Sequence, residues 1–480
     1  MQLLPSSLKH HHSSSYRLAK NLFLILSSVF IVYLLVSMFV IFTSKGLLIH
    51  SPEPELTGHL TSLDHVVFAI ISSENSWLKC TDYAKLWWRP QQMKGCVFLE
   101  SIPPPDSLDL HNDTDSLLPP ICISADTSRF PYSNQRGLQS ALRAAHAVSE
   151  IMAMDRSDVR WFVFGDEDTV FFPDNLVKTL SKYDHRIWYY VGSGSENFEQ
   201  NREFGFGMAF GGAGFAISSS LARVLAKKID SCLERYPRLY GGDARVYSCI
   251  MELGIGMTHE PGFHQFDVRG DAFGLLAAHP VSPVVSIHNL KWIDPIFPNK
   301  TTAESLEHLF KAARVDPERL LQQTICYDRW FSWTISVSWG YAVQVFPGHL
   351  FLPDATRVQE TFKHWKKGNH LADSYVLNTR YLHPDPCGRS TVFFFDQVHS
   401  DEDGIRSTYR KLSKDNCSYD PASPRHLEEI RVYSRKLRRS VRQLMAPRRQ
   451  CCDILPSSNN KVIDVAVRGC KEEELIYMHM

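Results

Sequence analysis

Three consecutive acidic residues, Asp166, Glu167 and Asp168, form the most chemically distinctive group in the sequence. They follow the apolar segment RWFVF (160–164) with only Gly165 between. Such a segment is typical of a buried strand, and ligands of open α/β sheets bind at the carboxyl ends of strands. A divalent cation would relieve the repulsion among three carboxylates, and oxygen ligands favour magnesium or manganese over zinc. We therefore expect a metal and phosphate site here, with a solvated acidic turn as the structural alternative.

A glycine-rich segment, MAFGGAGFAI (208–217), is a second candidate for ligand contact. Gly211, Gly212 and Gly214 separate two apolar pieces, and a residue without a Cβ lets a ligand approach the backbone closely. The lysine and the hydroxyl residue that close a nucleotide-binding P-loop are missing. The segment is therefore equally compatible with ligand contact and with a tight turn before a strand.

Two further residues stand where a side chain can face a cleft. Asp243 lies at the start of a predicted helix in YGGDARVYSCIMEL (240–253). Its carboxylate can cap that helix, and a capping carboxylate that faces a cleft can also act as a general base. His288 ends the apolar segment PVVSIH (283–288), where an imidazole can complete the shell of a cation, although a single histidine is more often structural.

The elements that must position these residues alternate along the chain. Segments 65–72, 95–99 and 160–164 are apolar and predict strands. Segments 77–88 and 138–152 have the spacing of helices. Strands that alternate with helices predict an α/β fold with a mixed or mostly parallel sheet flanked by helices.

The pattern changes beyond about residue 305. Segments 334–346 and 390–398 predict strands of a more β-rich unit. Residues 427–444 fit an amphipathic helix with a cationic outer face, although an alternating stretch inside it resembles a strand. We therefore expect a domain boundary between residues 304 and 305 and a β-rich, cysteine-containing domain over residues 305–480.

A long apolar segment near the N-terminus predicts a membrane helix. Residues 22–43 are 22 residues without a charge, long enough to cross a hydrocarbon core of about 30 Å. The apolar region of a cleavable signal peptide is shorter. Three basic residues precede the span, so residues 1–21 should be a cytosolic tail. Residues 44–61 read as a polar stem, and the rest of the chain should face the lumen of the secretory pathway.

Charge and cysteine distribution agree with this topology. The chain has 52 basic and 52 acidic residues, which argues against nucleic acid as a partner. All eleven cysteines, and three acceptor sites for N-glycosylation at Asn112, Asn299 and Asn416, lie on the predicted lumenal side, where disulfides persist. Because eleven is odd, at least one thiol must be free or pair with another chain.

The order of these features resembles a known family. A membrane anchor, GDEDT (165–169), AFGGAGFAIS (209–218), an aspartate that begins a helix and a histidine on a strand follow one another as in the Fringe-like β-1,3-glycosyltransferases, glycosyltransferase family 31. The segments DTSRF, DNLVKTLSKYDH and GFHQFD and the cysteine-rich tail further resemble the plant branch of that family, which is described mainly as a domain of unknown function. The core motifs cover residues 62 to about 300.

This resemblance implies a GT-A-like glycosyltransferase domain over residues 62–304 and a role for each candidate residue. Asp168 and His288 would bind manganese or magnesium, and Asp243 would be the catalytic base. Glu167 stands where the family usually has aspartate, which changes the reach of that carboxylate. The donor would be bound by Asp166, Glu167, Gly211, Gly212 and Gly214.

The implied function is that of a single-pass type II protein of the Golgi membrane. It would transfer a hexose-type sugar from a UDP-sugar to a glycan or glycoprotein acceptor by inverting β-1,3 transfer. A non-catalytic lumenal sugar-binding protein that keeps the fold is the first alternative. The second is a glycoside hydrolase that uses Asp168 and Asp243 as its carboxylate pair. If Asp243 only caps its helix, the base would be sought among Asp267, His264 and Glu260.

Overall fold

The structure is a computed structural model in which the chain divides into two units, Met1–Leu60 and Thr61–Met480. It describes residues 11–47, 60–104, 117–154, 158–365, 375–412, 417–457 and 459–478.

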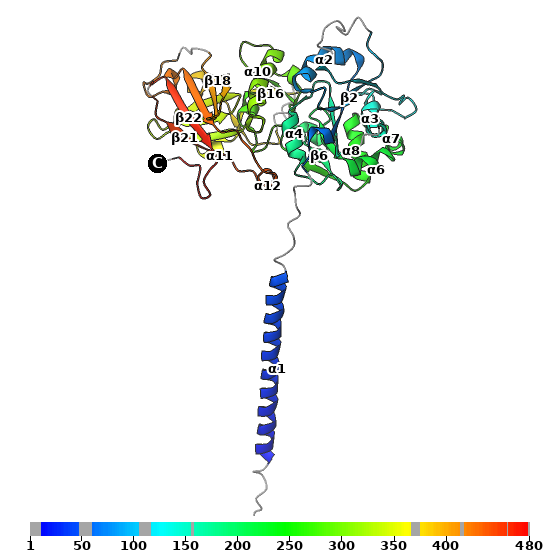
Figure 1. Ribbon diagram of the computed structural model, residues 1–480, viewed down its shortest axis with the longest axis vertical. Coiled ribbons are helices and arrows are strands. Elements are labelled where there is room, and N and C mark those ends of the chain that lie inside the picture. Colours follow the sequence, from blue (N-terminus) through cyan, green and yellow to red (C-terminus); the bar gives the residue numbers. More distant parts are fainter. Residues whose placement is uncertain are drawn as a thin grey trace, which may run out of the picture. The chain divides into compact units, whose positions relative to one another are not determined.

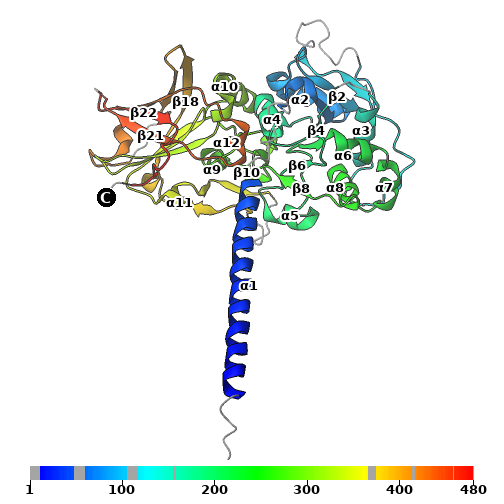
Figure 2. The same cartoon turned by 60° about the horizontal axis from the view of Figure 1, so that its bottom comes forward.

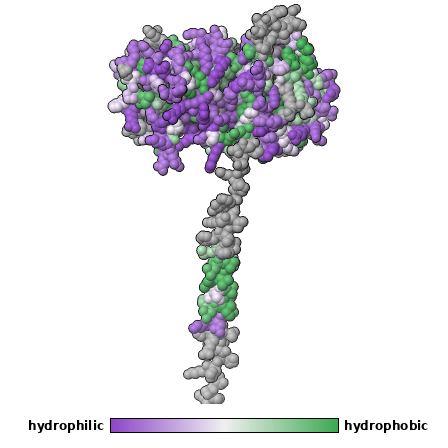
Figure 3. Space-filling view, in the orientation of Figure 1, coloured by the Kyte–Doolittle hydropathy of each residue, from purple (hydrophilic) through white to green (hydrophobic). Residues whose placement is uncertain are grey.

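The first unit contains one long helix, α1 (His11–Leu47). Its segment Lys20–Met38 has a mean hydropathy of 2.3 and is long and apolar enough to cross a membrane. The space-filling view shows this part of α1 as a hydrophobic surface (Figure 3). The predicted apolar helix is therefore present as a possible membrane anchor, whereas the predicted stem, residues 44–61, lies mostly outside the described residues.

The second unit is organised around a mixed seven-stranded sheet of order β3-β2-β1-β4-β7-β6-β8. Among these strands β7 runs antiparallel to both of its neighbours, and every other pair is parallel. The strands are β1 (Val66–Ile71), β2 (Lys94–Leu99), β3 (Ile121–Ile123), β4 (Trp161–Asp166), β6 (Tyr190–Gly192), β7 (Phe215–Ser218) and β8 (Met257–His259).

Both faces of this sheet are buried. Alternate residues of a strand point to opposite faces, and each face packs into a different hydrophobic core. In β1, Phe68 and Ile70 belong to one hydrophobic core and Val67 and Ala69 to another. The second core also contains α3 (Ala141–Ala153), α6 (Ser219–Ala226), α7 (Ile229–Arg235) and α8 (Gly242–Glu252). The first contains α2 (Glu74–Trp87) and α4 (Pro173–Leu180), so helices flank the sheet as the sequence predicts (Figure 1).

A small three-stranded sheet lies at the end of β4. Its order is β5-β11-β9, with β5 (Val170–Phe171), β9 (Phe263–Gln265) and β11 (Ser286–His288). Two strand pairs and two helices complete this part of the unit: β10 (Val268–Gly270) with β16 (Phe362–His364), β15 (Val358–Glu360) with β17 (Thr379–Tyr381), α5 (Phe198–Phe204) and α9 (Phe273–Ala277).

The C-terminal region is rich in strands, as predicted. Its eight-stranded sheet has the order β12-β13-β14-β18-β19-β20-β22-β21, and β18, β21 and β22 lie together in both ribbon views (Figure 2). Neighbours are antiparallel except β20 and β22. The strands are β12 (Gln323–Tyr327), β13 (Thr334–Ser338), β14 (Ala342–Phe346), β18 (Thr391–Ser400), β19 (Ile405–Arg410), β20 (Glu429–Ser434), β21 (Cys451–Leu455) and β22 (Val462–Arg468), joined by α11 (Leu352–Ala355) and α12 (Val441–Met445).

The amphipathic helix suggested by the spacing of residues 427–444 is wrong, whereas the alternating stretch within it is a strand as its pattern indicates. Strand β20 occupies its first half, and only the short α12 follows. Both edges of β20 are paired, with β19 and β22, and its alternate residues Ile430 and Val432 are fully buried. Burial of alternate residues in the middle of a sheet outweighs the local helical spacing.

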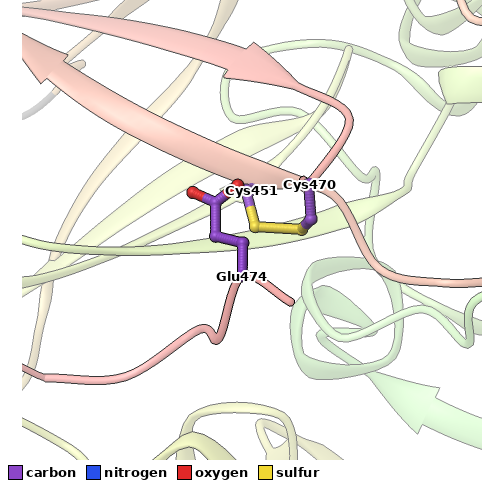
Figure 4. A group of neighbouring side chains, drawn as sticks. All are labelled: Cys451, Cys470 and Glu474. Atoms are coloured by element: carbon purple, nitrogen blue, oxygen red, sulfur yellow. A yellow bond between two sulfur atoms is a disulfide. The ribbon is translucent and has the colours of Figure 1, made fainter. Parts of the chain in front are cut away.

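Ten cysteines form five disulfides, and Cys80 on α2 is the free thiol that the odd number requires. Cys451, Cys470 and Glu474 lie close enough to suggest a metal site, but the two sulfurs are joined in a disulfide and offer no thiolate (Figure 4). The bonded pairs are Cys96–Cys122, Cys232–Cys249, Cys326–Cys452, Cys387–Cys417 and Cys451–Cys470.

The predicted boundary between residues 304 and 305 falls inside α10 (Thr302–Val315). This helix contacts α2 on one side and β18 of the C-terminal sheet on the other. One hydrophobic core contains residues of β1 and of β13 alike. The division of residues 61–480 into two domains therefore stays a prediction.

Candidate active site

The acidic triplet links the large sheet to the small one. Asp166 is the last residue of β4, opposite Ile71 of β1, and β5 begins at Val170. The Asp166 N–H donates to Thr169 Oγ1 at 2.8 Å, and this hydroxyl donates to the Gly212 carbonyl at 2.7 Å. The turn that carries the three carboxylates is thus fixed to the glycine-rich segment at the carboxyl end of the sheet.

Pairing in the small sheet brings His288 to the triplet. Ile287 of β11 pairs with Val170 of β5, so the next residue of β11 reaches back toward the turn. His288 Nε2 lies 3.0 Å from Asp168 Oδ1 and 3.9 Å from Asp166 Oδ2. The side chains of Asp168 and His288 are only 3% and 9% exposed. The two residues that the sequence proposes as metal ligands are therefore direct neighbours.

Gln265, which was not among the predicted site residues, orients the histidine. It pairs with His288 in the parallel strands β9 and β11, and its Oε1 lies 3.1 Å from His288 Nδ1. The same oxygen accepts the Ala213 N–H at 2.8 Å, while Gln265 Nε2 donates to Asp267 Oδ1 at 3.1 Å. An amide oxygen can only accept, so His288 Nδ1 must carry the proton. Burial lowers the pKa of His288, but its contact with Asp168 outweighs burial and raises the pKa, so Nε2 donates to Asp168 Oδ1. A bound cation would replace the proton on Nε2.

The three alternative bases are all engaged in buried contacts. Asp267 accepts hydrogen bonds from Ser195 Oγ at 2.6 Å and Asn289 Nδ2 at 2.8 Å, besides the one from Gln265. His264 is buried and bonded through both ring nitrogens, and Glu260 is buried against a tyrosine and a lysine. These contacts give each of the three a structural role.

The glycine-rich segment forms the turn before β7. The Gly214 N–H donates to the Gly211 carbonyl at 3.0 Å, and Gly214 has a φ of +82°. A Cβ on Gly212 would lie 2.2 to 2.7 Å from ring atoms of His288. Glycine is therefore needed at position 212 for the imidazole to reach Asp168. Contact of these glycines with a donor stays a prediction.

Asp243 is not the N-cap of its helix. Helix α8 begins at Gly242 with Gly241 as its N-cap, so Asp243 lies in the first turn. Gly242 also packs closely on α3, where a Cβ would lie 2.5 Å from a side chain of that helix. Asp243 Oδ2 accepts the Gly211 N–H at 3.1 Å, and Oδ1 accepts the Ala244 N–H at 2.8 Å.

A cavity of about 200 Å³ is lined by both Asp166 and Asp243. The carboxylate at the end of β4 and the one at the start of α8 therefore face a shared space, next to the turn that holds Asp168. Glu167 is not among the residues that line it. The full lining is Ile71, Ala144, Phe164, Gly165, Asp166, Gly211, Phe215, Gly241, Gly242, Asp243 and Val246.

Burial and neighbouring charges separate the acids of the site. Burial raises the pKa of Asp166, with the other carboxylates adding to this effect and His288 opposing it; its side chain is 44% exposed, so water tempers the shift. Burial also raises the pKa values of Asp243 and Glu167. For Asp168 burial acts in the same direction, but His288 and Lys291 outweigh it and hold its pKa far below the usual range.

Lys291 was not predicted from the sequence. Its Nζ lies 2.9 Å from Asp168 Oδ2, and its side chain is 49% exposed. A basic residue three positions after the candidate ligand His288 is the only signal that the sequence offers for it. His288 contacts one carboxylate oxygen of Asp168 and Lys291 the other, and of these two partners Lys291 is the half-exposed one.

Comparison with curated proteins gives no match for this chain. Several solved glycosyltransferases are similar to parts of it. They are a mannosyltransferase from Pyrobaculum calidifontis in complex with GDP-mannose and Mn²⁺ (TM-score 0.29, 14% identity, 45% of this chain and 62% of that chain), the galactosyltransferase LgtC with donor and acceptor sugar analogues (0.30, 13%, 51% and 94%) and mouse xyloside xylosyltransferase 1 (0.25, 9%, 42% and 84%).

The predicted fold class is confirmed: a mixed α/β sheet flanked by helices, a β-rich region with disulfides and one apolar N-terminal helix. A family match covers a larger share of the chain than any of these three structures does. The family described as "Protein of unknown function, DUF604" matches residues 200–452, and because this is more than half of the 480 residues, the chain belongs to that family.

Proposed function

We propose that the chain is a glycosyltransferase of the Fringe-like β-1,3 type that transfers a hexose-type sugar from a UDP-sugar to a glycan or glycoprotein acceptor with inversion. One observation carries the proposal. Asp166 and Asp243 line one cavity, and Asp168, in the turn that begins at Asp166, lies 3.0 Å from His288. This arrangement supplies a donor site, a pair of metal ligands and a base at one edge of the sheet.

Asp168 and His288 fit a divalent cation. The carboxylate stays ionised, and the contact with Gln265 directs His288 Nε2 toward it. One carboxylate oxygen and one imidazole nitrogen suit manganese better than magnesium. When bound, the cation would act as a Lewis acid on the diphosphate of the departing nucleotide. The protein's own part is to hold two ligands in a nearly dry setting and to move Lys291 away from Asp168.

Asp243 is suited to take the proton of the acceptor. Burial raises its pKa, which makes the carboxylate a stronger base, and the N–H groups of Gly211 and Ala244 fix its direction. As the acceptor oxygen attacks the anomeric carbon from the face opposite the nucleotide, Asp243 removes the hydroxyl proton. A single displacement inverts the configuration and needs no covalent nucleophile.

The compartment follows from the same proposal: a single-pass type II protein of the Golgi membrane with its catalytic part in the lumen. It is supported by the apolar segment of α1, by the basic residues before this segment and by five disulfides, which persist in oxidising compartments. Protease added to sealed vesicles should leave the C-terminus intact; digestion of the C-terminus would reverse the orientation.

One observation favours a second candidate function. Lys291 occupies one oxygen of Asp168, the carboxylate that a cation needs. If this ion pair were permanent, the chain would be a non-catalytic lumenal sugar-binding protein that keeps the fold. The glycoside hydrolase has no comparable support, because it gives no role to His288, which lies 3.0 Å from Asp168.

The test is a transfer assay with the purified full chain in detergent. A panel of nucleotide sugars is offered with glycan acceptors, with and without Mn²⁺, and the products are analysed by mass spectrometry. We expect an acceptor to gain one hexose unit only when metal is present. Binding of sugars without transfer from any donor would favour the sugar-binding protein.

A further inference from the structure

A second and larger cavity lies in the β-rich region. Its volume is about 770 Å³, within the range of ligand sites, and it shares no residue with the cavity of Asp166 and Asp243. It lies between the loop that follows β12 and the segment that joins β21 to β22. We call it the aromatic groove; its residues include Asp328, Trp330, Phe331, Trp333, Asn459 and Asn460.

Two aromatic side chains of this groove are exposed to solvent. Trp330 is 89% exposed and Phe331 51% exposed, whereas Trp333 between them and β13 is 3% exposed. Phe331 stacks on Trp333 with the ring centroids 4.5 Å apart, and Trp333 Nε1 donates to the Ala422 carbonyl at 3.0 Å. Exposed apolar rings cost hydrophobic free energy, and where they gather they generally mark a binding surface.

Hydrogen bonds hold the backbone of the loop that carries these rings. The Asp328 carboxylate, 5% exposed, accepts the backbone N–H groups of Trp330, at 3.0 Å, and of Phe331. Ser332 has a φ of +56°, a left-handed conformation that costs energy for a residue with a Cβ. The loop thus contains a buried carboxylate with hydrogen bonds and a strained residue, and it presents an indole, that of Trp330, which makes few contacts. Such preorganisation reduces the entropy lost on binding.

The rest of the groove combines apolar and polar residues; the apolar ones are Leu427, Ile454, Leu455, Pro456, Val462 and Ile463. Ser457, Asn459 and Asn460 lie exposed on the segment between β21 and β22 and line the same cavity as Trp330. The charged residues of the lining have both signs, and Arg329 is one of them. Asparagine amides offer both donors and acceptors, as a ligand with many hydroxyl groups requires.

We propose that the aromatic groove binds a neutral glycan. The C–H face of a sugar ring stacks on Trp330 and Phe331, because the negative face of an aromatic ring attracts polarised C–H bonds, and sugar hydroxyls bond to Asn459 and Asn460. The choice of a glycan over a protein partner rests on the proposed function, which requires an acceptor glycan to be held. A membrane surface fits less well, because the lining lacks the basic cluster that anionic lipids attract.

The test measures binding by the full chain in detergent, without nucleotide. The probes are cellohexaose, xylohexaose, mannohexaose and a β-1,3-glucan hexasaccharide, with the acidic oligogalacturonide of the same length for comparison. Binding is followed by isothermal titration for the parent and for Trp330→Ala. Trp188→Ala, which removes a 39% exposed tryptophan outside the groove, is the matched control. Trp330 is so exposed that its removal should leave the melting temperature unchanged.

We expect at least one neutral probe to bind and Trp330→Ala to weaken it by on the order of tenfold or more, with Trp188→Ala unchanged. Asp243→Asn should bind the same probe as the parent does, so glycan binding and sugar transfer can fail separately. Absence of binding to every neutral probe would overturn the proposal. Equal glycan affinity in Trp330→Ala and the parent would also overturn it, as would stronger binding of the acidic probe than of the neutral ones. The same holds if Trp330→Ala changes only the binding of the chain to phosphatidylcholine vesicles, or only its self-association.

Discussion

His288 and Gln265 are register partners in the parallel strands β11 and β9, and the Gln265 amide oxygen lies 3.1 Å from His288 Nδ1. The pairing of the two strands thus places the Gln265 amide oxygen where it keeps a proton of His288 on Nδ1. Gln265 is in turn held by Ala213 and Asp267, so the imidazole is oriented by a chain of buried contacts before any cation binds.

Replacing Gln265 by leucine should weaken Mn²⁺ binding by about 10- to 100-fold, the usual effect of losing the partner of a metal-bound histidine. Titration of the full chain with Mn²⁺ measures the affinity. Gln344→Leu is the matched control, because Gln344 is also buried and bonded through its amide, but in the C-terminal sheet. The two variants should lose comparable stability. Equal Mn²⁺ affinity in both would show that Gln265 does not orient the ligand.

Gly212→Ala should displace the His288 ring, because the new methyl group would lie as close as 2.2 Å to a ring carbon. We expect Mn²⁺ affinity to fall sharply while most of the fold remains. Gly256→Ala serves as the control, since a Cβ at that position meets no atom within 4 Å. Parental Mn²⁺ affinity in Gly212→Ala would mean that His288 is not a ligand.

Lys291→Met should raise Mn²⁺ affinity, by about tenfold or less because the lysine is half-exposed and screened. The ammonium group now competes with a cation for Asp168 Oδ2. Lys311→Met removes the same charge from an exposed position of α10 and corrects for the change in net charge. A loss of affinity in Lys291→Met would instead assign the lysine a supporting role in the metal site.

The sequence predicts those parts of the site whose signals are local. The apolar run before Asp166 predicts β4, and the run before His288 predicts β11. Gln265 has no local signal, because its role depends on the register between strands that are far apart in the chain. Strand β5, whose pairing with β11 brings His288 to Asp168, has only two residues, too few to show an alternating hydrophobic pattern in the sequence. In the C-terminal region the spacing of residues 427–444 misleads for the same reason: the partners of β20 are distant.

A buried chain of hydrogen bonds behind the site sets a pH dependence of stability. His264 Nδ1 lies 2.9 Å from Glu196 Oε1, His264 Nε2 lies 2.8 Å from His279 Nε2, and His279 Nδ1 lies 2.8 Å from the Pro280 carbonyl. A carbonyl only accepts, so His279 Nδ1 donates to it, His264 Nε2 donates to His279 Nε2, and the Glu196 carboxyl donates to His264 Nδ1. Glu196, His264 and His279 are therefore all neutral. Burial raises the pKa of Glu196 to about 8, lowers the pKa of His264 to about 4 and lowers that of His279 further.

The contribution of these three groups to the free energy of unfolding should therefore be highest near pH 6.5. Below that pH the unfolded chain protonates both imidazoles and the folded chain does not, so acid destabilises the fold. Glu196 acts in the opposite direction, because its folded carboxyl keeps a proton that the unfolded one loses near pH 4.5. Two histidines outweigh one glutamate below pH 6.5. Between pH 6.5 and about 8 only the glutamate among these three groups contributes, at about 1.4 kcal/mol per pH unit at most.

Melting temperatures of the parent and of Glu196→Gln across pH 5 to 9 test this account. The glutamine keeps a donor for His264 Nδ1 but cannot titrate. The decline above pH 6.5 should therefore be smaller in the variant, and the loss of stability below pH 6.5 should be steeper, because Glu196 no longer offsets the two histidines. An unchanged alkaline slope would show that Glu196 is ionised in the folded chain.

The central claim is that Asp243 is the base of a sugar transfer, and the rate of transfer by Asp243→Asn tests it most directly. Asparagine keeps the size of the side chain and an oxygen for the Gly211 N–H, so the variant should fold and bind the nucleotide sugar as the parent does. Product formation, followed by mass spectrometry at saturating donor, should fall by on the order of a hundredfold or more. Transfer at the parental rate by a folded, donor-binding Asp243→Asn would contradict the account.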